Sequence, residues 1–311
     1  MAIVKPFKAV RPSRDKVALV SSKSFDAYTD KELDAKLEFN PFTFLHILNP
    51  GYKYHQEFSG EQRFQMIHNR YEEFKENKIF IKDETASFYI YESSNAHDYF
   101  CGIIGATAVD DYNNGTIKKH EGTIKKREQL FETYLKTTGF NAEPVLLTYK
   151  DDEKFNTLLQ TLKKKRPEYE FSTTDKKLHR LWLVNDKENI KKIISFFEDK
   201  EALYIADGHH RSASSSLLKT DLQAENIHHK GDENYNFFMS YIIPESNLKI
   251  SEFNRFIKDL NGLSIDEFLI ELDKSYRIED RGEHFYKPSQ KHHFSMYLGG
   301  KFYSLYLRKS L

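Results

Sequence analysis

The sequence predicts an α/β or α+β protein in which helices flank a mixed sheet. Apolar segments of strand length interleave with longer segments of helical periodicity, and no segment repeats at a fixed period. Of the 311 residues, 39% are hydrophobic and 14% are aromatic, which is enough for a sizeable core. We expect a single unit over 1–311, with a subdivision into 1–150 and 151–311.

In the first part of the chain, short apolar runs predict strands and longer patterns predict helices. VALV (17–20) and the alternating PFTFLHIL (41–48) are predicted as strands, with a helix starting near Thr29 between them. A capping box at Ser59–Gln62, followed by apolar residues at helical spacing, predicts a second helix. Two further runs, ASFYIYE and YFCGIIGATAV, predict neighbouring strands.

The rest of the chain continues this alternation. A helix with Thr123 as N-cap is predicted to stop at Gly139, because glycine favours the left-handed cap conformation. Strands are predicted at PVLLTY, LHRLWLV and NYNFFMSYII, with helices at EKFNTLLQTLKKK and KENIKKIISFFEDK. Two more helices are predicted from SEFNRFIKDL and from a capping box at Ser264–Glu267, and a final hairpin turns at Gly299–Gly300.

Charge and cysteine content exclude several classes of protein. Lys plus Arg and Asp plus Glu both total 47, so the basic excess typical of a nucleic-acid-binding protein is missing. The run at 163–166 is expected to be the solvated end of a helix. No stretch has the length of a membrane-spanning helix. Cys101 stands alone and is expected to be a small buried hydrophobe, which favours a cytoplasmic protein without membrane partners.

The stretch ALYIADGHHRSASSSLL (202–218) carries the strongest functional signal. A strand-like run enters a turn that holds an acid, a glycine, two histidines and an arginine, and a helix-compatible segment follows. Backbone N–H groups at a helix start, together with the helix dipole, favour a bound phosphate or carboxylate. We therefore expect this turn to bind phosphate or nucleotide through Gly208, His209, His210, Arg211 and Ser212, with Ser214 nearby.

Asp207 at the head of this turn has two further roles open to it. As a carboxylate it is a candidate magnesium ligand and a candidate catalytic base for a hydroxyl nucleophile. The structural alternative is that Asp207 only caps the helix and Gly208 only makes the turn. A zinc site is not expected, because adjacent histidines on a helix point about 100° apart. The glycine patterns of the common nucleotide-binding loops are also missing.

Two other polar clusters lie elsewhere in the chain. One, KKHEGTIKKRE, places His120, Glu121 and Arg127 just before or within the first turns of a helix; the residues alone slightly favour a solvated loop with Thr123 as N-cap. The other, Ser21–Asp26, reads by itself as a polar loop. His179 in LHRLWLV is expected to be a half-buried, paired strand residue.

Four segments in this order resemble the bacterial and archaeal family known as domain of unknown function 1015. They are PFKAVRP, HEGTIKKREQLFETYLKTTGFNAEPVLLTY, LHRLWLV and YIADGHHRSASS. The resemblance covers most of the chain. Members of the family usually have Pro-Pro-Tyr-Asp where this chain has Lys23–Asp26, so Asp26 matches the pattern and the prolines do not. Family members also tend to run further, which implies a C-terminally shortened unit here.

The resemblance implies a function that the residue patterns do not specify. The signature turn of the family looks like the phosphate-binding turn of the ParB/sulfiredoxin superfamily, which includes nucleotide-dependent free serine kinases. Genes of the family often lie beside serine-biosynthesis genes. The implied activity is phosphoryl transfer from ATP or ADP, with Mg²⁺, to a small hydroxyl substrate, with L-serine favoured. Asp207, Glu121 and His120 would be catalytic, and Arg127 and Asp26 would bind substrate.

Two alternatives remain open at this point. The first is a regulator linked to serine metabolism that binds a nucleotide or a phosphorylated metabolite without turnover. The second is a nuclease or DNA-binding module, because ParB relatives include such proteins; the zero net charge argues against it.

Overall fold

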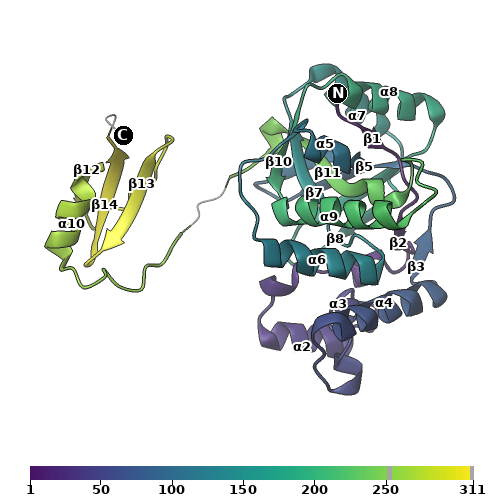
Figure 1. Cartoon of the computed structure of the whole chain (residues 1–311), viewed down its shortest axis with the longest axis horizontal. Coiled ribbons are helices and arrows are strands. Elements are labelled where there is room, and N and C mark those ends of the chain that lie inside the picture. The colour runs from purple at the N-terminus through teal and green to yellow at the C-terminus, as the bar shows by residue number, and fades with distance from the viewer. Residues whose placement is uncertain (251–253, 309–311) are drawn as a thin grey trace. The chain divides into compact units, whose positions relative to one another are not determined.

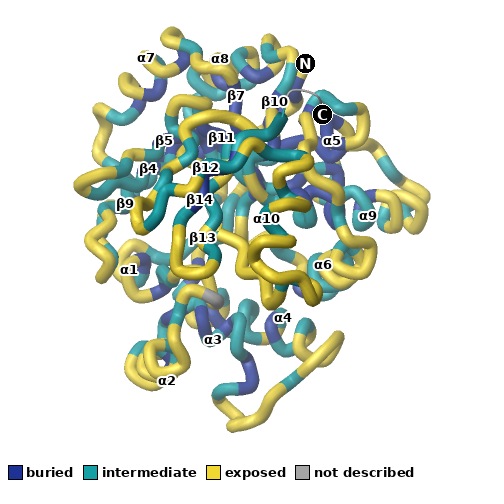
Figure 2. The backbone as a smooth tube through the Cα atoms, turned by 90° about the vertical axis from the view of Figure 1, so that its left-hand side faces the viewer, coloured by how far each residue is buried: buried dark blue, intermediate teal, exposed yellow. Residues whose placement is uncertain are grey.

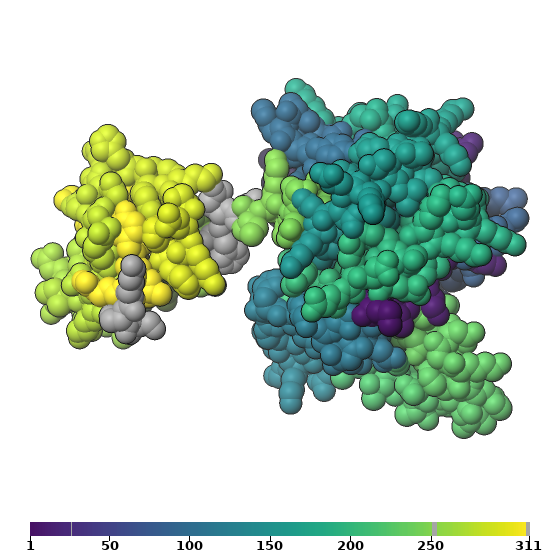
Figure 3. Space-filling model, turned by 90° about the horizontal axis from the view of Figure 1, so that it is seen from above, coloured from purple at the N-terminus to yellow at the C-terminus, as the bar shows by residue number. Residues whose placement is uncertain are grey.

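The computed structural model describes residues 1–250 and 254–308, apart from the side chain of Asp26. The chain forms two compact units, Met1–Lys249 and Ile250–Leu311, each with a sheet of its own (Figure 1). Residues near the N-terminus, in purple, form part of the surface in the view of Figure 3, and Met1 is exposed. The expected mixed α/β fold, with parallel and antiparallel strands and flanking helices, is confirmed.

A mixed sheet forms the centre of the larger unit. Its strands are β1 (Val4–Lys5), β4 (Phe88–Ser94), β5 (Tyr99–Ala108), β6 (Ile117–Lys118), β7 (Val145–Tyr149), β8 (Tyr169–Ser172), β9 (Leu178–Val184), β10 (Leu203–Asp207) and β11 (Phe237–Pro244). They lie in the order β6-β10-β7-β11-β5-β4-β9-β8, and β1 pairs with β5. The pairs β6–β10 and β7–β11 are parallel, and the other pairs of this sheet are antiparallel. A separate ribbon pairs β2 (Val10–Pro12) with β3 (Phe80–Lys82).

Helices surround this sheet. They are α1 (Val17–Val20), α2 (Asp30–Phe39), α3 (Leu45–Leu48), α4 (Gly60–Glu76), α5 (Val109–Asn113), α6 (Lys125–Thr138), α7 (Glu153–Leu162), α8 (Lys187–Glu198) and α9 (His209–Glu225). In Figure 1, α7 and α8 lie at the top and α9 and α6 lie lower, packed against each other. An ion pair of 2.8 Å between Lys136 and Glu225 joins α6 to α9.

The two faces of the sheet follow from the alternation of side chains along its strands. Phe88 and Ile90 of β4 and Trp182 of β9 are buried in one core cluster with the inner faces of α7 and α8. The intervening residues, Tyr89 and Tyr91, therefore face the opposite side. A second, smaller core lies between α3, α4 and β3. Figure 2 shows that burial concentrates in the strands and inner helix faces of the larger unit.

Three predicted helix ends are confirmed in position and one is wrong. Thr29 caps α2 in a full capping box, and Gly139 ends α6 in the left-handed conformation with φ 75°. Ser59 precedes α4 as expected but makes no side-chain cap hydrogen bond. The N-cap of α6 is Ile124 rather than Thr123, because the Thr123 hydroxyl donates to Glu128 instead of capping the helix.

Two predicted strands are short helices. VALV forms α1 and LHIL forms α3. In α3 the buried Leu45 and Ile47 flank the half-exposed His46, so the burial alternates as it would in a strand although the backbone is helical. A run of four residues carries too little periodicity to separate the two conformations.

Two further expectations concern Lys163, in the basic run at 163–166, and Cys101, whose surroundings include Glu92 of β4. The expectation of a solvated run is wrong for Lys163. Its side chain is only 9% exposed, and its ammonium lies 2.8 Å from the buried Glu92 carboxylate. The other three residues of the run are exposed. Cys101 is free and buried as predicted, and burial raises the pKa of its thiol.

The smaller unit packs one helix with a three-stranded antiparallel sheet. The helix is α10 (Ile265–Asp273), and the strands are β12 (Tyr276–Gly282), β13 (His293–Leu298) and β14 (Lys301–Leu307), in the order β12-β14-β13. The capping box at Ser264 and the hairpin turn at Gly299–Gly300 are confirmed. The helix predicted from SEFNRFIKDL is wrong for 254–260, which are irregular; residues 251–253 lie outside the described part of the chain.

Candidate functional site

The parallel pair β6–β10 brings two of the three polar clusters together. Leu203 and Tyr204 of β10 pair with Ile117 and Lys118 of β6, so the loops that follow the two strands leave the same edge of the sheet. The first loop holds His120 and the second is the signature turn, 207–211. His120 and His209, which are 89 positions apart in sequence, are thereby neighbours at the start of α9.

Gly208 is the N-cap of α9, with φ 101°, a backbone conformation that favours glycine. A Cβ atom added there would lie 3.1 Å from Nε and 3.2 Å from Cζ of Arg211. The lack of a side chain at Gly208 therefore makes room for the Arg211 guanidinium. The structural alternative for Asp207 as N-cap is wrong, since Asp207 is the last residue of β10 and Gly208 is the cap.

Arg211 is already engaged by groups of the chain itself. Its guanidinium donates to the Asp207 carboxylate and to the Pro144 carbonyl, and it lies 3.3 Å from the Glu143 carboxylate. Pro144 directly precedes β7, which runs antiparallel to β10 and so starts at the edge where β10 ends. Two carboxylates thus surround one guanidinium, and the turn presents no excess of positive charge.

His209 is buried and holds the His120 loop against the turn. Its Nε2 accepts from the backbone N–H of His120 at 3.4 Å, so the ring proton belongs on Nδ1, which lies 3.8 Å from a Glu121 carboxylate oxygen. The two imidazole rings pack edge to face at 4.4 Å. Burial, together with the neighbouring His120, lowers the pKa of His209, so the ring is neutral at pH 7.

His120 and Glu121 themselves are exposed. Their side chains are 57% and 67% exposed, and the shortest distance between His120 Nε2 and a Glu121 oxygen is 4.0 Å. An exposed imidazole and an exposed carboxylate beside the start of α9 are accessible to a ligand.

The other residues of the turn behave differently from one another. Nδ1 of His210 is buried, and no partner for it lies among the described residues. Ser212 departs from the expectation of a phosphate ligand, because it is fully buried and its hydroxyl donates to the Gly208 carbonyl at 3.3 Å. The hydroxyls of Ser214 and Ser215 both donate to the Arg211 carbonyl. The serine-rich segment is therefore an inner face of α9 made of small residues.

The two residues expected to bind substrate are not joined to this site by the structure. Arg127 is exposed in the first turn of α6, and within residues 1–250 and 254–308 it forms no ion pair. The side chain of Asp26 lies outside the described residues. Its segment, 21–28, borders a cavity on another part of the sheet.

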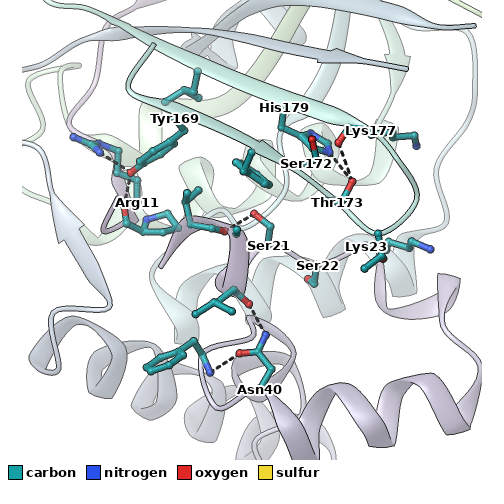
Figure 4. A pocket seen from close by; sticks show the side chains of 18 of the residues that line it. Arg11, Ser21, Ser22, Lys23, Asn40, Tyr169, Ser172, Thr173, Lys177 and His179 are labelled. Atoms are coloured by element: carbon teal, nitrogen blue, oxygen red, sulfur yellow. Dashed lines mark hydrogen bonds between the residues drawn. The ribbon is translucent and has the colours of Figure 1, made fainter. Parts of the chain in front are cut away.

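This cavity is a feature that the sequence analysis missed. It has a volume of about 1250 Å³ and lies against β4, β9 and β11, under α1 and α2 (Figure 4). None of the residues 120, 121, 127 or 207–212 lines it. Two sequence signals point to it: the Ser21–Asp26 loop lines one end, and His179 lines the floor. As predicted, His179 is half-buried and paired, with Tyr91 Oη at 2.7 Å and Thr173 Oγ1 at 3.2 Å.

Among the described residues, no group of three or more His, Cys, Asp or Glu side chains is placed to hold a metal ion. The carboxylates at the signature turn, Asp207 and Glu121, are 70% and 67% exposed. Such a pair does not make a metal cage by itself.

Comparison with known families gives one match, which covers nearly the whole chain. Residues 4–311 match the family described as protein of unknown function (DUF1015). The chain belongs to this family. Neither the curated proteins nor the solved structures provide a significant match. In the described parts of this DUF1015 chain, no helix is both long enough and apolar enough to cross a membrane.

Proposed function

We propose that this DUF1015 protein is a cytoplasmic small-molecule kinase that transfers a phosphoryl group from ATP or ADP to a hydroxyl group. L-serine is the acceptor that the sequence resemblance implies. The observation that supports the proposal is the meeting of the His120–Glu121 loop with the start of α9, through the β6–β10 pair. A helix start offers backbone N–H groups to phosphate, and an exposed carboxylate beside it offers a base.

The phosphate contacts in this proposal come from the backbone at the start of α9. Gly208 carries no side chain, so no side-chain cap occupies the N–H groups of the first turn. His210 adds a buried ring nitrogen that has no partner in the described residues. Arg211 already binds Asp207 and Pro144, and we assign it the role of holding the turn in shape.

The carboxylates fit a magnesium ion that arrives with a nucleotide. Mg²⁺ keeps several waters and binds one or two carboxylates together with the phosphates of its substrate. Asp207 supplies one such carboxylate, and the lack of excess positive charge around Arg211 makes a cation necessary for a polyphosphate to bind. When bound, the ion neutralises phosphate charge. Glu121, the exposed carboxylate that no arginine holds, takes the proton of the acceptor hydroxyl.

The test is thermal stability with ATP, ADP or CTP in the presence of Mg²⁺, with and without L-serine, followed by mass spectrometry for phosphoserine. A ligand that binds only the folded state raises the melting temperature by mass action. We expect one nucleotide to raise it, serine to increase the effect, and phosphoserine to form. No shift with any nucleotide at millimolar concentration overturns the proposal.

Glu121→Gln separates catalysis from binding. We expect it to keep the nucleotide shift and to lower turnover by roughly 100-fold or more, the usual contribution of an acid–base group. Glu84→Gln, at an exposed turn between β3 and β4, is the matched control and should change neither quantity. Equal turnover in the two variants would remove Glu121 from the mechanism.

A non-catalytic nucleotide-binding regulator is the second candidate. It is favoured by one observation: Arg211 already binds Asp207, so one of the two carboxylates that the kinase proposal uses is engaged by the chain itself. A regulator would show the nucleotide-dependent shift in the wild-type protein without any phosphoserine.

A further inference from the structure

The cavity against β4, β9 and β11 is large enough to enclose a small molecule. Its volume of about 1250 Å³ exceeds the range of roughly 300–1,000 Å³ typical of ligand sites. It shares no residue with the signature turn or the His120–Glu121 loop, so what it binds is a separate question from the kinase proposal.

The floor and the roof of the cavity are mainly apolar. Tyr91, Leu181 and Met239 line the floor from three strands of the sheet, and all three are only half-buried. Ala18 of α1 and Phe39 of α2 line the roof, and Phe39 is 77% exposed. Apolar side chains that converge on one cavity and stay partly exposed favour an occupant with an apolar or aromatic body.

One end of the cavity is polar and carries positive charge. Figure 4 shows Lys23 and Lys177 on the same side of the cavity, with Arg11 and Tyr169 on the other side. Hydroxyl groups of Ser22 and Ser172 lie at the lysine end.

The acids that line the cavity are already engaged. Asp175 lies 3.5 Å from Lys177, and the Glu32 carboxylate accepts from the backbone and hydroxyl of Thr29, both at 2.9 Å. Lys23, in contrast, forms no ion pair within residues 1–250 and 254–308. The Glu32 carboxylate is near enough to interact with its charge, but the exposed Lys23 ammonium remains accessible to an anionic group.

His179 adds no charge to the floor. Its two ring nitrogens contact the hydroxyls of Tyr91 and Thr173, and its ring stacks on Phe171 at 5.1 Å. Burial lowers the pKa of His179, which agrees with a neutral ring at pH 7.

We propose that this cavity binds a small amphipathic acid. The apolar body lies against Tyr91, Leu181 and Met239, and a single anionic head contacts Lys23 and the neighbouring hydroxyls. The prediction distinguishes this site from one that binds any apolar compound, because the head group must contribute to affinity.

Two fluorescent probes that differ by one charge test the proposal on the full chain. Anilinonaphthalene sulfonate has an aromatic body and an anionic head, and phenylnaphthylamine has the same body without the sulfonate. We expect Lys23→Gln to weaken the sulfonate probe by roughly ten-fold or more, as loss of a charged hydrogen bond does, and to leave the neutral probe unchanged. Lys191→Gln, at an exposed position on α8, is the control and should affect neither probe.

Filling the cavity tests its location. Met239→Trp fills it from the sheet, and Ala18→Trp fills it from an exposed position on α1, where the larger side chain poses little risk to folding. Both should weaken both probes, with far-ultraviolet circular dichroism and the urea midpoint unchanged. The proposal is overturned if neither probe binds, if Lys23→Gln binds the sulfonate as tightly as wild type, or if correctly folded tryptophan variants retain wild-type affinity.

Discussion

Replacing Gly208 with alanine tests how the signature turn is held. The residue has φ 101°, and its new Cβ would lie 3.1–3.3 Å from three atoms of the Arg211 guanidinium. The side chain of Arg211 cannot move away freely, because Asp207 and the Pro144 carbonyl bind it. A non-glycine residue in a sparsely populated backbone region costs about 1–3 kcal/mol. A cost of about 2 kcal/mol lowers the melting temperature of a unit of this size by roughly 4–8 °C.

Differential scanning calorimetry of Gly208→Ala against Gly122→Ala measures this cost. Gly122 lies in the neighbouring loop, and a Cβ there would meet no atom within 4 Å, so its variant should melt with the wild type. If Gly208→Ala melts at the same temperature as Gly122→Ala, the reasoning about the turn is refuted. In an Arg211→Ala background the substitution should cost less, because the contact with the guanidinium is gone while the backbone strain remains.

Three further predictions concern groups away from this turn. Lys163→Met should lower the free energy of unfolding by about 1.5–3 kcal/mol in urea titrations, because the buried Glu92 carboxylate loses its closest cation and keeps Arg180 at 3.2 Å. Burial raises the pKa of Glu92, but hydrogen bonds from Lys163 and other groups outweigh burial and lower the pKa below the usual 4.5. The resulting stabilisation should be present above pH 4.5 and disappear as the pH falls further. In acid titrations, the wild type should show this loss of stability and the Lys163→Met variant should show less of it. Glu233 is partly desolvated, yet backbone N–H groups lower its pKa to about 2, so Glu233→Gln should speed hydrogen exchange at the Gly231 amide at neutral pH. Cys101 should resist Ellman's reagent in the native protein and react at once in urea; rapid native reaction would contradict its burial.

The long elements of the fold were predictable from sequence, because they carry several turns or several alternations. The helices α4, α6, α7, α8 and α9 and the strands β4, β5, β7, β9 and β11 all occur where their periodicity placed them. The short segments VALV and LHIL were predicted wrongly, because four apolar residues bury the same side chains in either conformation. Val20 of α1 and Ile47 of α3 are buried in one cluster with residues of α4 and β3, and these contacts lie outside the two short segments themselves.

The candidate site was predictable in its composition but not in its connections. ADGHHR identifies a polar turn before a helix, and Gly208 and His209 are where that pattern places them. The partners of Arg211 and His209 come from 143–144 and 120–121, and only the strand order of the folded sheet brings these segments together. The large cavity was missed for the same reason, since it is formed by segments from five parts of the chain.

The strands β10 and β7 run in opposite directions, and this affects which sequence changes can alter the signature turn. Where all strands run the same way, the segments entering strands gather at one edge and those leaving them at the other, so one edge can vary while the other is preserved. Here the segment that enters β7 shares an edge with the segment that leaves β10. Substitutions or insertions at 140–144 would therefore reshape the surroundings of Arg211 through Pro144 while every residue of the ADGHHR sequence stays the same.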